Sequence, residues 1–286
     1  MLSNSPYLNM STLTITGIQT NLFWEDKKAN IRMLEKKIAS IPQPTEVVVL
    51  PEMFSTGFSM NPQLLAEPVD GETVQWMKKV ATEKKIILTG SLIISQAGPG
   101  NKTSYYNRLV WMLPNGQFGC YDKRHLFAYG DEDQHYTPGD KQLVASVKGW
   151  KIKVLVCYDL RFPVWARQNF NSDSSQTRRG ERTFEYDVLI YVANWPERRI
   201  NAWKTLLQAR AIENQCYVVG INRVGEDGNR IHYPGESMVV DPAGETLYQK
   251  KDEEDVFTVT LDKSYLESIR EKFPFWRDAD AFKIIN

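Results

Sequence analysis

The chain has 286 residues, of which 42% are hydrophobic and 24% charged, so it is long and apolar enough to bury a sizeable core and is typical of neither a disordered nor a fibrous protein. Lysine plus arginine and aspartate plus glutamate number 35 each, a balance that gives no support to a nucleic-acid partner. No run approaches the roughly 18 apolar residues of a membrane span, and the N-terminus lacks the basic and apolar regions of a signal peptide.

Short apolar runs recur along the chain and predict strands. Three segments between them carry apolar residues on one helical face, namely 25–39, 72–84 and 202–215. Pro-Asn-Gly and Pro-Ala-Gly sequences at 114–116 and 242–244 predict turns between strand pairs. The strand-like runs lie at 11–20, 45–54, 84–94, 105–117, 151–160, 186–194, 216–225, 236–245 and 255–261.

The predicted order is β-α-β-α-β-β, repeated once and followed by a C-terminal tail from about residue 260. No long linker or low-complexity block interrupts it, and the polar stretch 171–182 is too short to separate domains. We therefore expect one domain of the α/β class over residues 1–286. Strands as continuously apolar as 47–50 and 188–193 should be covered by helices on one face and by an equally apolar layer, such as a second sheet, on the other.

The three cysteines, Cys120, Cys157 and Cys216, are odd in number and widely spaced. They form neither a disulfide framework nor a metal-binding pattern, so we expect a reducing, cytoplasmic location.

Reactive residues lie at the ends of three predicted strands: Glu52, Lys123 and Cys157. Each alone has an ordinary interpretation, as a solvated acid, a surface charge and a packed thiol. Functional residues of α/β folds, however, gather at the carboxyl ends of strands. Together, the three residues could perform acyl transfer.

A thiol is mostly protonated at neutral pH and needs a base or a cation beside it. Glu52 would take the proton of Cys157. Lys123, with the backbone N–H of Tyr158, would hold the oxyanion. A pairing of the cysteine with one of the three histidines (His125, His135 and His232) remains an alternative.

The sequences around these residues resemble those of a known family. "VVLPEMF", "YDKRHLF" and "CYDLRFP" resemble the three catalytic blocks of the nitrilase superfamily, the carbon–nitrogen hydrolases. "YVANWPERR", "WKTLLQARAIENQCYVVGINRVG" and "YPGESMVVDPAGE" resemble its later blocks in the same order. "KRHLF", "HYTPG", "ANWPERR" and the tail "KFPFWRDADAF" look like one subgroup, the omega-amidases that hydrolyse monoamides of 2-oxo dicarboxylic acids.

The resemblance implies a role for individual residues. Cys157 would be the nucleophile, Glu52 the general base and Lys123 the oxyanion-stabilising cation. A second glutamate of the family matches Glu132, which would position Lys123 and the substrate amide. The neighbouring acids at 131 and 133 remain alternatives, as does an acidic loop in contact with solvent.

The resemblance also implies a fold, an activity and an assembly. The fold would be a four-layer α-β-β-α sandwich that forms homodimers or higher homo-oligomers. The reaction would be hydrolysis of substrates such as 2-oxoglutaramate and 2-oxosuccinamate through a thioester, with no metal and no organic cofactor. The sequence agrees with that last point, since it has no His-Glu-x-x-His motif and no cluster of cysteine and histidine ligands.

Further residues near these blocks carry weaker expectations. Asp159 and Arg161 are expected to form an ion pair that fixes the turn after Cys157. Trp195 could line the pocket or belong to the core. Arg199, with Arg198 as its neighbouring alternative, is our candidate for binding the substrate carboxylate. Both arginines could instead be solvated loop charges.

Helix 202–215 carries Arg210 and Glu213, three residues apart. We expect them to form a packing or interface pair rather than to bind substrate.

Other activities remain open at this point. An N-carbamoyl amidohydrolase or an aliphatic amidase would share the same Cys-Glu-Lys set and differ only in its pocket. A non-catalytic binding protein with this fold would be expected to lack at least one of the three residues, and all three are present.

Overall fold

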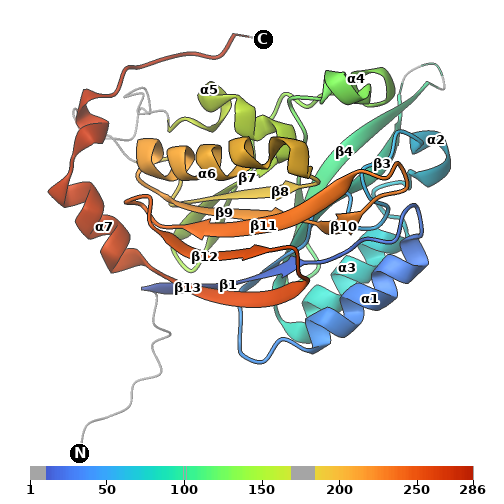
Figure 1. The fold of residues 1–286 in the computed structure, drawn as a ribbon, viewed down its shortest axis with the longest axis horizontal. Coiled ribbons are helices and arrows are strands. Elements are labelled where there is room, and N and C mark those ends of the chain that lie inside the picture. The colour runs from blue at the N-terminus through green and yellow to red at the C-terminus, as the bar shows by residue number, and fades with distance from the viewer. Residues whose placement is uncertain (1–10, 99, 101, 169–183, 286) are drawn as a thin grey trace, which may run out of the picture.

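A computed structural model describes residues 11–98, 100, 102–168 and 184–285. In these ranges two β-sheets pack face to face, and helices cover the outer face of each (Figure 1). The polar stretch 171–182 lies outside the described residues.

The first sheet has six strands in the order β13-β1-β2-β3-β4-β5. The three central strands β1, β2 and β3 run parallel, and the other neighbours pair antiparallel. The turn predicted at 114–116 joins β4 to β5, and Gly116 adopts the left-handed φ of +80° that glycine tolerates best. The bounds are β1 (Thr12–Gln19), β2 (Val47–Val49), β3 (Ile87–Ala97), β4 (Thr103–Met112), β5 (Phe118–Asp122) and β13 (Asp255–Asp262).

The second sheet has seven strands, ordered β10-β11-β9-β8-β7-β6 with β12 paired to β11. Its centre, β7, β8 and β9, is also parallel. The turn predicted at 242–244 joins β11 to β12. The bounds are β6 (Val144–Val147), β7 (Trp150–Val156), β8 (Val188–Ala193), β9 (Tyr217–Asn222), β10 (Val224–Glu226), β11 (His232–Val240) and β12 (Thr246–Lys251).

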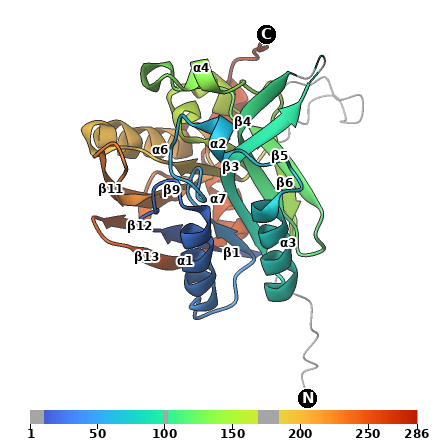
Figure 2. The same cartoon turned by 90° about the vertical axis from the view of Figure 1, so that its right-hand side faces the viewer.

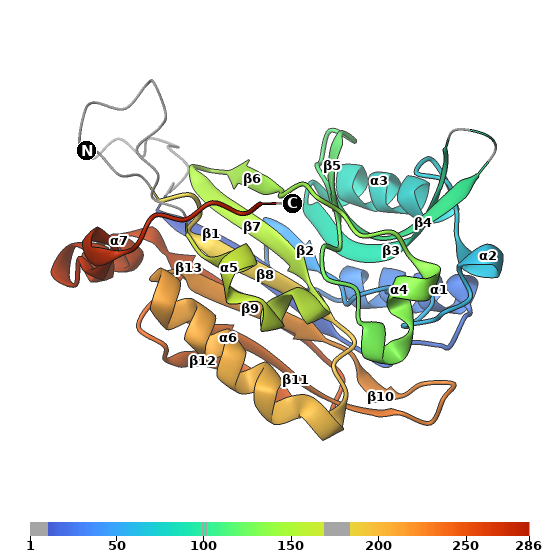
Figure 3. The ribbon, with the colours of Figure 1, turned by 90° about the horizontal axis from the view of Figure 1, so that it is seen from above.

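The three predicted helices are confirmed. Figures 2 and 3 show that α1 and α3 lie against the first sheet and α6 lies against the second. No helix within the described ranges is long and apolar enough to cross a membrane. The bounds are α1 (Lys27–Ala39), α2 (Pro62–Leu65), α3 (Glu72–Lys84), α4 (Glu132–His135), α5 (Pro163–Ala166), α6 (Ile200–Asn214) and α7 (Lys263–Lys272).

The short strand β2 shows how the layers are held together. All three of its valines are fully buried. Val47 and Val49 pack in the cluster that includes both sheets, whereas Val48 packs with the apolar side chains of α1 and α3. Because successive side chains of a strand point to opposite faces, a continuous apolar run fits a sheet covered on both sides. This confirms the predicted second sheet and the α-β-β-α sandwich.

One glycine marks the close approach of the two sheets. A Cβ atom at Gly17 of β1 would lie 2.5 Å from a methyl group of Ile221 on β9 and 2.4 Å from the ring of Phe257 on β13. A side chain at this position would require both neighbours to shift.

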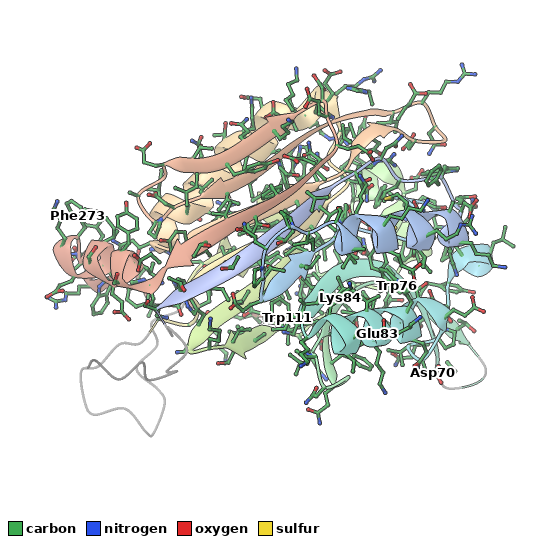
Figure 4. The ribbon with its side chains drawn as sticks, turned by 90° about the horizontal axis from the view of Figure 1, so that it is seen from below. Asp70, Trp76, Glu83, Lys84, Trp111 and Phe273 are labelled. Atoms are coloured by element: carbon green, nitrogen blue, oxygen red, sulfur yellow. The ribbon has the colours of Figure 1, made fainter. Side chains whose placement is uncertain are left out.

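The chain beyond the sandwich starts slightly later than predicted, because β13 continues to Asp262 before α7 begins. Figure 4 shows Phe273, which follows α7, far from Trp76 of α3, which lies toward the other end of the molecule.

Candidate active site

Cys157 lies where β7 ends and opens a 3-10 turn, Cys157–Arg161, with a backbone φ of +44°. A residue with a side chain rarely adopts this left-handed conformation, which costs about 1–3 kcal/mol and recurs at active sites. The side chain is 9% exposed and lines a cavity, with Sγ 4.0 Å from the carbonyl oxygen of Asn194. The thiol is therefore at the edge of the core, where a ligand in the cavity can reach it.

Glu52 lies three residues beyond β2 and is fully buried. Its Oε1 accepts hydrogen bonds from Asn107 Nδ2 at 2.8 Å and from Lys123 Nζ at 2.9 Å. Its Oε2 accepts one from the backbone N–H of Asn194 at 2.8 Å. The Asn194 side chain donates in turn to the Glu52 carbonyl at 2.7 Å. Donors from both sheets therefore fix this carboxylate.

Lys123 follows β5, and its ammonium group lies between two carboxylates. The Nζ atom is 2.9 Å from Glu52 Oε1 and 3.0 and 2.8 Å from the two carboxylate oxygens of Glu132 on α4. All three side chains are buried. Each therefore depends on the others to compensate its charge, because water cannot do so.

Glu132 is the only one of the three consecutive acids at 131–133 that is buried; both of its neighbours are exposed. Its Oε2 also accepts the backbone N–H of Phe127 at 2.6 Å, and its Oε1 accepts Asn107 Nδ2 at 3.1 Å. Among the three candidate acids of the sequence, Glu132 is thus the one in contact with Lys123.

The charges of this cluster determine its protonation. Burial alone would lower the pKa of Lys123, but the Glu132 and Glu52 carboxylates outweigh it and raise that pKa. Burial, together with the Glu52 charge and against the Lys123 charge, raises the pKa of Glu132. Burial and the Glu52 charge raise the pKa of Cys157 well above its usual value. The thiol is therefore protonated at neutral pH, and its attack on a substrate requires a base.

The backbone around Cys157 offers a donor for an oxyanion. Tyr158 is the second residue of the turn, and N–H groups at the start of a helical turn have no carbonyl within it to donate to. Together with Lys123, this N–H could stabilise a negative oxygen next to Cys157.

The cavity that Cys157 lines has a volume of about 850 Å³. Phe127, Tyr158 and Trp195 are among its apolar walls. Trp195 is only 2% exposed and also packs on Trp203. It therefore lines the cavity and belongs to the core at the same time.

Four arginines line the same cavity: Arg161, Arg198, Arg199 and Arg230. Arg198 and Arg230 are exposed. Arg199 is half-buried, and its guanidinium lies 4.8 Å from the ring centroid of Phe127. Arg161 is also half-buried and lies 5.1 Å from the ring of Trp195. Within the described part of the chain, neither Arg161 nor Arg199 has a carboxylate within ion-pair distance.

The predicted ion pair between Asp159 and Arg161 is wrong. The buried Asp159 carboxylate accepts instead from Tyr121 OH at 2.7 Å and Val156 N at 3.0 Å. It also accepts from the His125 backbone N–H and contacts the His125 ring. Packing of β5 against the end of β7 brings these groups to Asp159 and leaves Arg161 free to face the cavity.

The pair Arg210–Glu213 is confirmed, at 3.0 Å. Arg210 also donates to the carbonyl of Leu160 at 2.6 Å, so the pair packs α6 against the turn that follows Cys157.

Within the described residues, no histidine is a hydrogen-bond partner of the Cys157 thiol, whose Sγ contacts the carbonyl oxygen of Asn194. His125 contacts Asp159 at 2.8 Å, and His232 is exposed and lies 3.6 Å from Asp252. The described residues contain no group of three or more His, Cys, Asp or Glu side chains placed to hold a metal ion.

Two residues of the cluster were missed in the sequence. Asn194 directly follows the buried strand β8, the same signal that singled out the residues after β2 and β7. Asn107 lies inside β4, and asparagine is unfavourable in strands. This unusual residue type was the only feature of the sequence that could have indicated a functional role.

A Lys123→Met variant should lose both activity and stability. If Lys123 stabilises the oxyanion as expected from the sequence, its removal should lower the rate about 10²–10³-fold. Two buried carboxylates would also lose their cation, which should lower the free energy of unfolding by about 3–5 kcal/mol at pH 8.

The stability deficit of Lys123→Met should depend on pH. A carboxyl whose folded-state pKa is raised, as for Glu132, stabilises the fold at low pH and loses this contribution as the pH rises through that pKa. Urea unfolding should therefore show a smaller deficit at pH 5 than at pH 8. Lys148→Met, at a half-exposed pair with Glu46, is the control and should lose under about 1 kcal/mol. An equal deficit at both pH values would contradict the argument.

Comparisons with known proteins agree over nearly the whole chain. The family model for carbon-nitrogen hydrolases matches residues 14–271. Omega-amidase YafV from Escherichia coli (strain K12) is 40% identical over 276 residues, which cover 96% of this chain and 100% of the relative. A 2-oxoglutaramate amidase from Bacillus subtilis (strain 168) is 32% identical over 269 residues, 93% of this chain and 96% of the relative.

A solved structure is also similar. The crystal structure of XC1258 from Xanthomonas campestris, described as a CN-hydrolase superfamily protein with an arsenic adduct in the active site, has a TM-score of 0.89 at 38% identity. The match covers 96% of this chain and 99% of that one.

Proposed function

This chain belongs to the carbon-nitrogen hydrolase family, and we propose that it is an omega-amidase, which releases ammonia from the terminal amide of 2-oxo dicarboxylic acid monoamides such as 2-oxoglutaramate and 2-oxosuccinamate. The enzyme is a hydrolase of amide carbon–nitrogen bonds. The relatives named omega-amidase and 2-oxoglutaramate amidase match this chain over nearly their full length. Their names support this substrate class.

One observation carries the proposal: the cavity next to Cys157 contains arginines that have no ion pair within the described residues. A 2-oxo dicarboxylate monoamide carries a carboxylate at the end remote from its scissile amide. Arginine suits its recognition, because the planar guanidinium donates two hydrogen bonds to a carboxylate. Arg199 and Arg161, each stacked on an aromatic ring, are available for this contact.

The proposed reaction begins with transfer of the Cys157 proton to Glu52. The thiolate attacks the amide carbon, and Lys123 with the Tyr158 N–H stabilises the oxyanion. Glu52 then gives its proton to the leaving nitrogen, and ammonia departs. In the second half, Glu52 takes a proton from water, hydroxide attacks the thioester, and the proton returns to the departing thiolate. Protons balance over the cycle without a cofactor.

A substrate panel with ammonia detection tests the proposal. 2-Oxoglutaramate should give the highest kcat/KM, above an N-carbamoyl amine and a neutral aliphatic amide of similar length. Cys157→Ala should be assayed in parallel to exclude a contaminating amidase. A higher kcat/KM for the N-carbamoyl amine would favour an N-carbamoyl amidohydrolase, and one for the neutral amide would favour an aliphatic amidase.

Arg199→Ala should raise the KM for 2-oxoglutaramate roughly 10–100-fold, the loss expected for a hydrogen bond between charged groups. It should barely change the KM of a neutral amide of similar length. Arg198→Ala, at the exposed alternative position in the same cavity, should be assayed in parallel to show which of the two arginines binds the carboxylate. An equal loss on both substrates would assign Arg199 a structural role, and no loss on either would mean that it does not bind the substrate carboxylate.

The proposal also includes a cytoplasmic location and a homodimeric or higher assembly. The three cysteines are free thiols, which supports a reducing compartment. Light scattering on the purified protein would measure its mass in solution.

A further inference from the structure

Asn107 occupies an unusual place for an asparagine. It lies within β4, between β3 and β5, and is 1% exposed. Its backbone carbonyl accepts the N–H of Lys123 at 3.0 Å, so it is the direct neighbour of that residue across the sheet. A side chain rooted in the middle of a sheet is held more rigidly than one on a loop.

The side chain of Asn107 is shared between two carboxylates. Its Nδ2 donates to Glu52 Oε1 at 2.8 Å and to Glu132 Oε1 at 3.1 Å. Lys123 Nζ donates to the same two oxygens, at 2.9 and 3.0 Å. Two donors and two acceptors thus form a closed ring, with one charged donor and one neutral donor on opposite sides.

The network fixes the orientation of this amide. A flipped Asn107 would turn its own oxygen toward two carboxylate oxygens, which repel it. In the observed orientation, Oδ1 is buried without a partner in the described part of the chain. Leaving a buried acceptor unpaired is unfavourable, so the contacts of Nδ2 must outweigh that cost.

The ring reduces the repulsion between the two carboxylates. Glu52 and Glu132 share a single lysine, so the buried cluster has one excess negative charge when the thiol is neutral. Like charges placed together in a buried site disfavour each other's ionised form. A neutral donor between the facing oxygens stabilises both carboxylates and keeps Lys123 available to an oxyanion.

We propose that Asn107 is a positioning residue, which holds Glu52 and Glu132 in place around Lys123 so that Glu52 can accept the proton of Cys157. The inference rests on the proposed amide hydrolysis, and it assigns Asn107 no contact with the substrate.

Asn107→Leu, close in shape but without a donor, should lower kcat about 10–100-fold and leave KM nearly unchanged. The groups facing Glu132 are Lys123, Glu52, Cys157 and Tyr136. Asn107 donates to Glu52 and Glu132 alike, so its loss disfavours the ionised carboxylate that must accept the proton of Cys157. As the pH is lowered, the variant should therefore lose activity at a higher pH than the wild type does. The acidic limb of its pH–activity profile should be shifted upward by about one pH unit.

Asn107→Asp, which keeps the shape but adds a third carboxyl group, should shift the acidic limb further in the same direction. Thr89→Val is the matched control: it removes another buried oxygen without a partner, on the neighbouring strand β3 and outside the ring. It should leave the pH profile unchanged. An unshifted limb in Asn107→Leu, or the same shift in Thr89→Val, would overturn the proposal.

A second measurement separates this inference from the substrate assignment. Iodoacetamide alkylation of Cys157, followed by intact mass as a function of pH in a Cys120→Ala/Cys216→Ala background, needs no natural substrate. The acidic limb of the alkylation rate should shift upward in Asn107→Leu. If the wild type hydrolyses none of the amides tested, the proposed function fails, while the alkylation profile still decides the role of Asn107. An unchanged alkylation profile overturns that role whichever substrates are hydrolysed.

Discussion

Cys157→Ala should abolish amide hydrolysis while leaving the fold intact. The thiol lies at the end of β7 in a left-handed conformation, next to a fixed carboxylate and within the arginine-lined cavity. The residues of such a site act as a unit, so losing the nucleophile should reduce the rate by several orders of magnitude. Cys157→Ser should be similarly inactive, because a hydroxyl group is a much weaker nucleophile and harder to deprotonate.

Ammonia release and intact mass measure this effect. The wild type, quenched during turnover, should carry the mass of the acyl group, and Cys157→Ala should not. Cys120→Ala and Cys216→Ala are the controls: Cys216 is buried and contacts the carbonyl of Arg210, and neither residue lines the cavity. Both variants should keep their activity. More than a few per cent of wild-type activity in Cys157→Ala would refute the assignment.

Glu52→Gln should block both halves of the reaction. An amide cannot take the proton of Cys157, nor activate the water that releases the acyl group. Both oxygens of Glu52 accept hydrogen bonds from N–H groups. The NH₂ group of glutamine would therefore face a donor in either orientation. We expect a rate loss of several orders of magnitude, with Lys123 still neutralised by Glu132.

Rapid mixing with an activated ester tests the role of Glu52. An ester with a good leaving group needs no protonation to depart, but attack still requires removal of the thiol proton. Glu52→Gln should therefore show neither a burst nor steady turnover. Glu46→Gln, at a half-exposed pair with Lys148, is the matched control and should behave as the wild type. Turnover of the ester by Glu52→Gln at the wild-type rate would show that Glu52 is not the base.

The helix boundaries show what local sequence patterns can and cannot predict. The apolar spacing predicted a helix over 25–39, and the observed helix starts at Lys27, because the side chain of Asp26 caps it by accepting the N–H of Ala29. The segment predicted over 202–215 starts at Ile200, directly after the short turn Glu197–Arg199. Periodicity locates a helix, whereas its first residue depends on local hydrogen bonds.

The turn after Cys157 shows where local reasoning fails. Asp159 and Arg161 have opposite charges and lie two residues apart, which suggested an ion pair. In the structure, Asp159 binds Tyr121 and His125 from a distant part of the chain, and Arg161 stacks on Trp195. Spacing along the sequence could not indicate these partners, because they come from segments that meet only after the sheets pack.

The fold class and the three residues near the ends of β2, β5 and β7 could be predicted from the sequence, because apolar runs indicate strands and a reactive side chain lies at the end of each. Three further points required the folded chain: which acid contacts Lys123, which arginines share the cavity with Cys157, and which asparagines donate to Glu52. Asn107 and Asn194 are 55 and 142 residues away from Glu52 in the chain, yet they donate to it at 2.8 Å. A hydrogen bond requires contact within about 3 Å, and only the packing of two sheets brings residues so distant in sequence that close together.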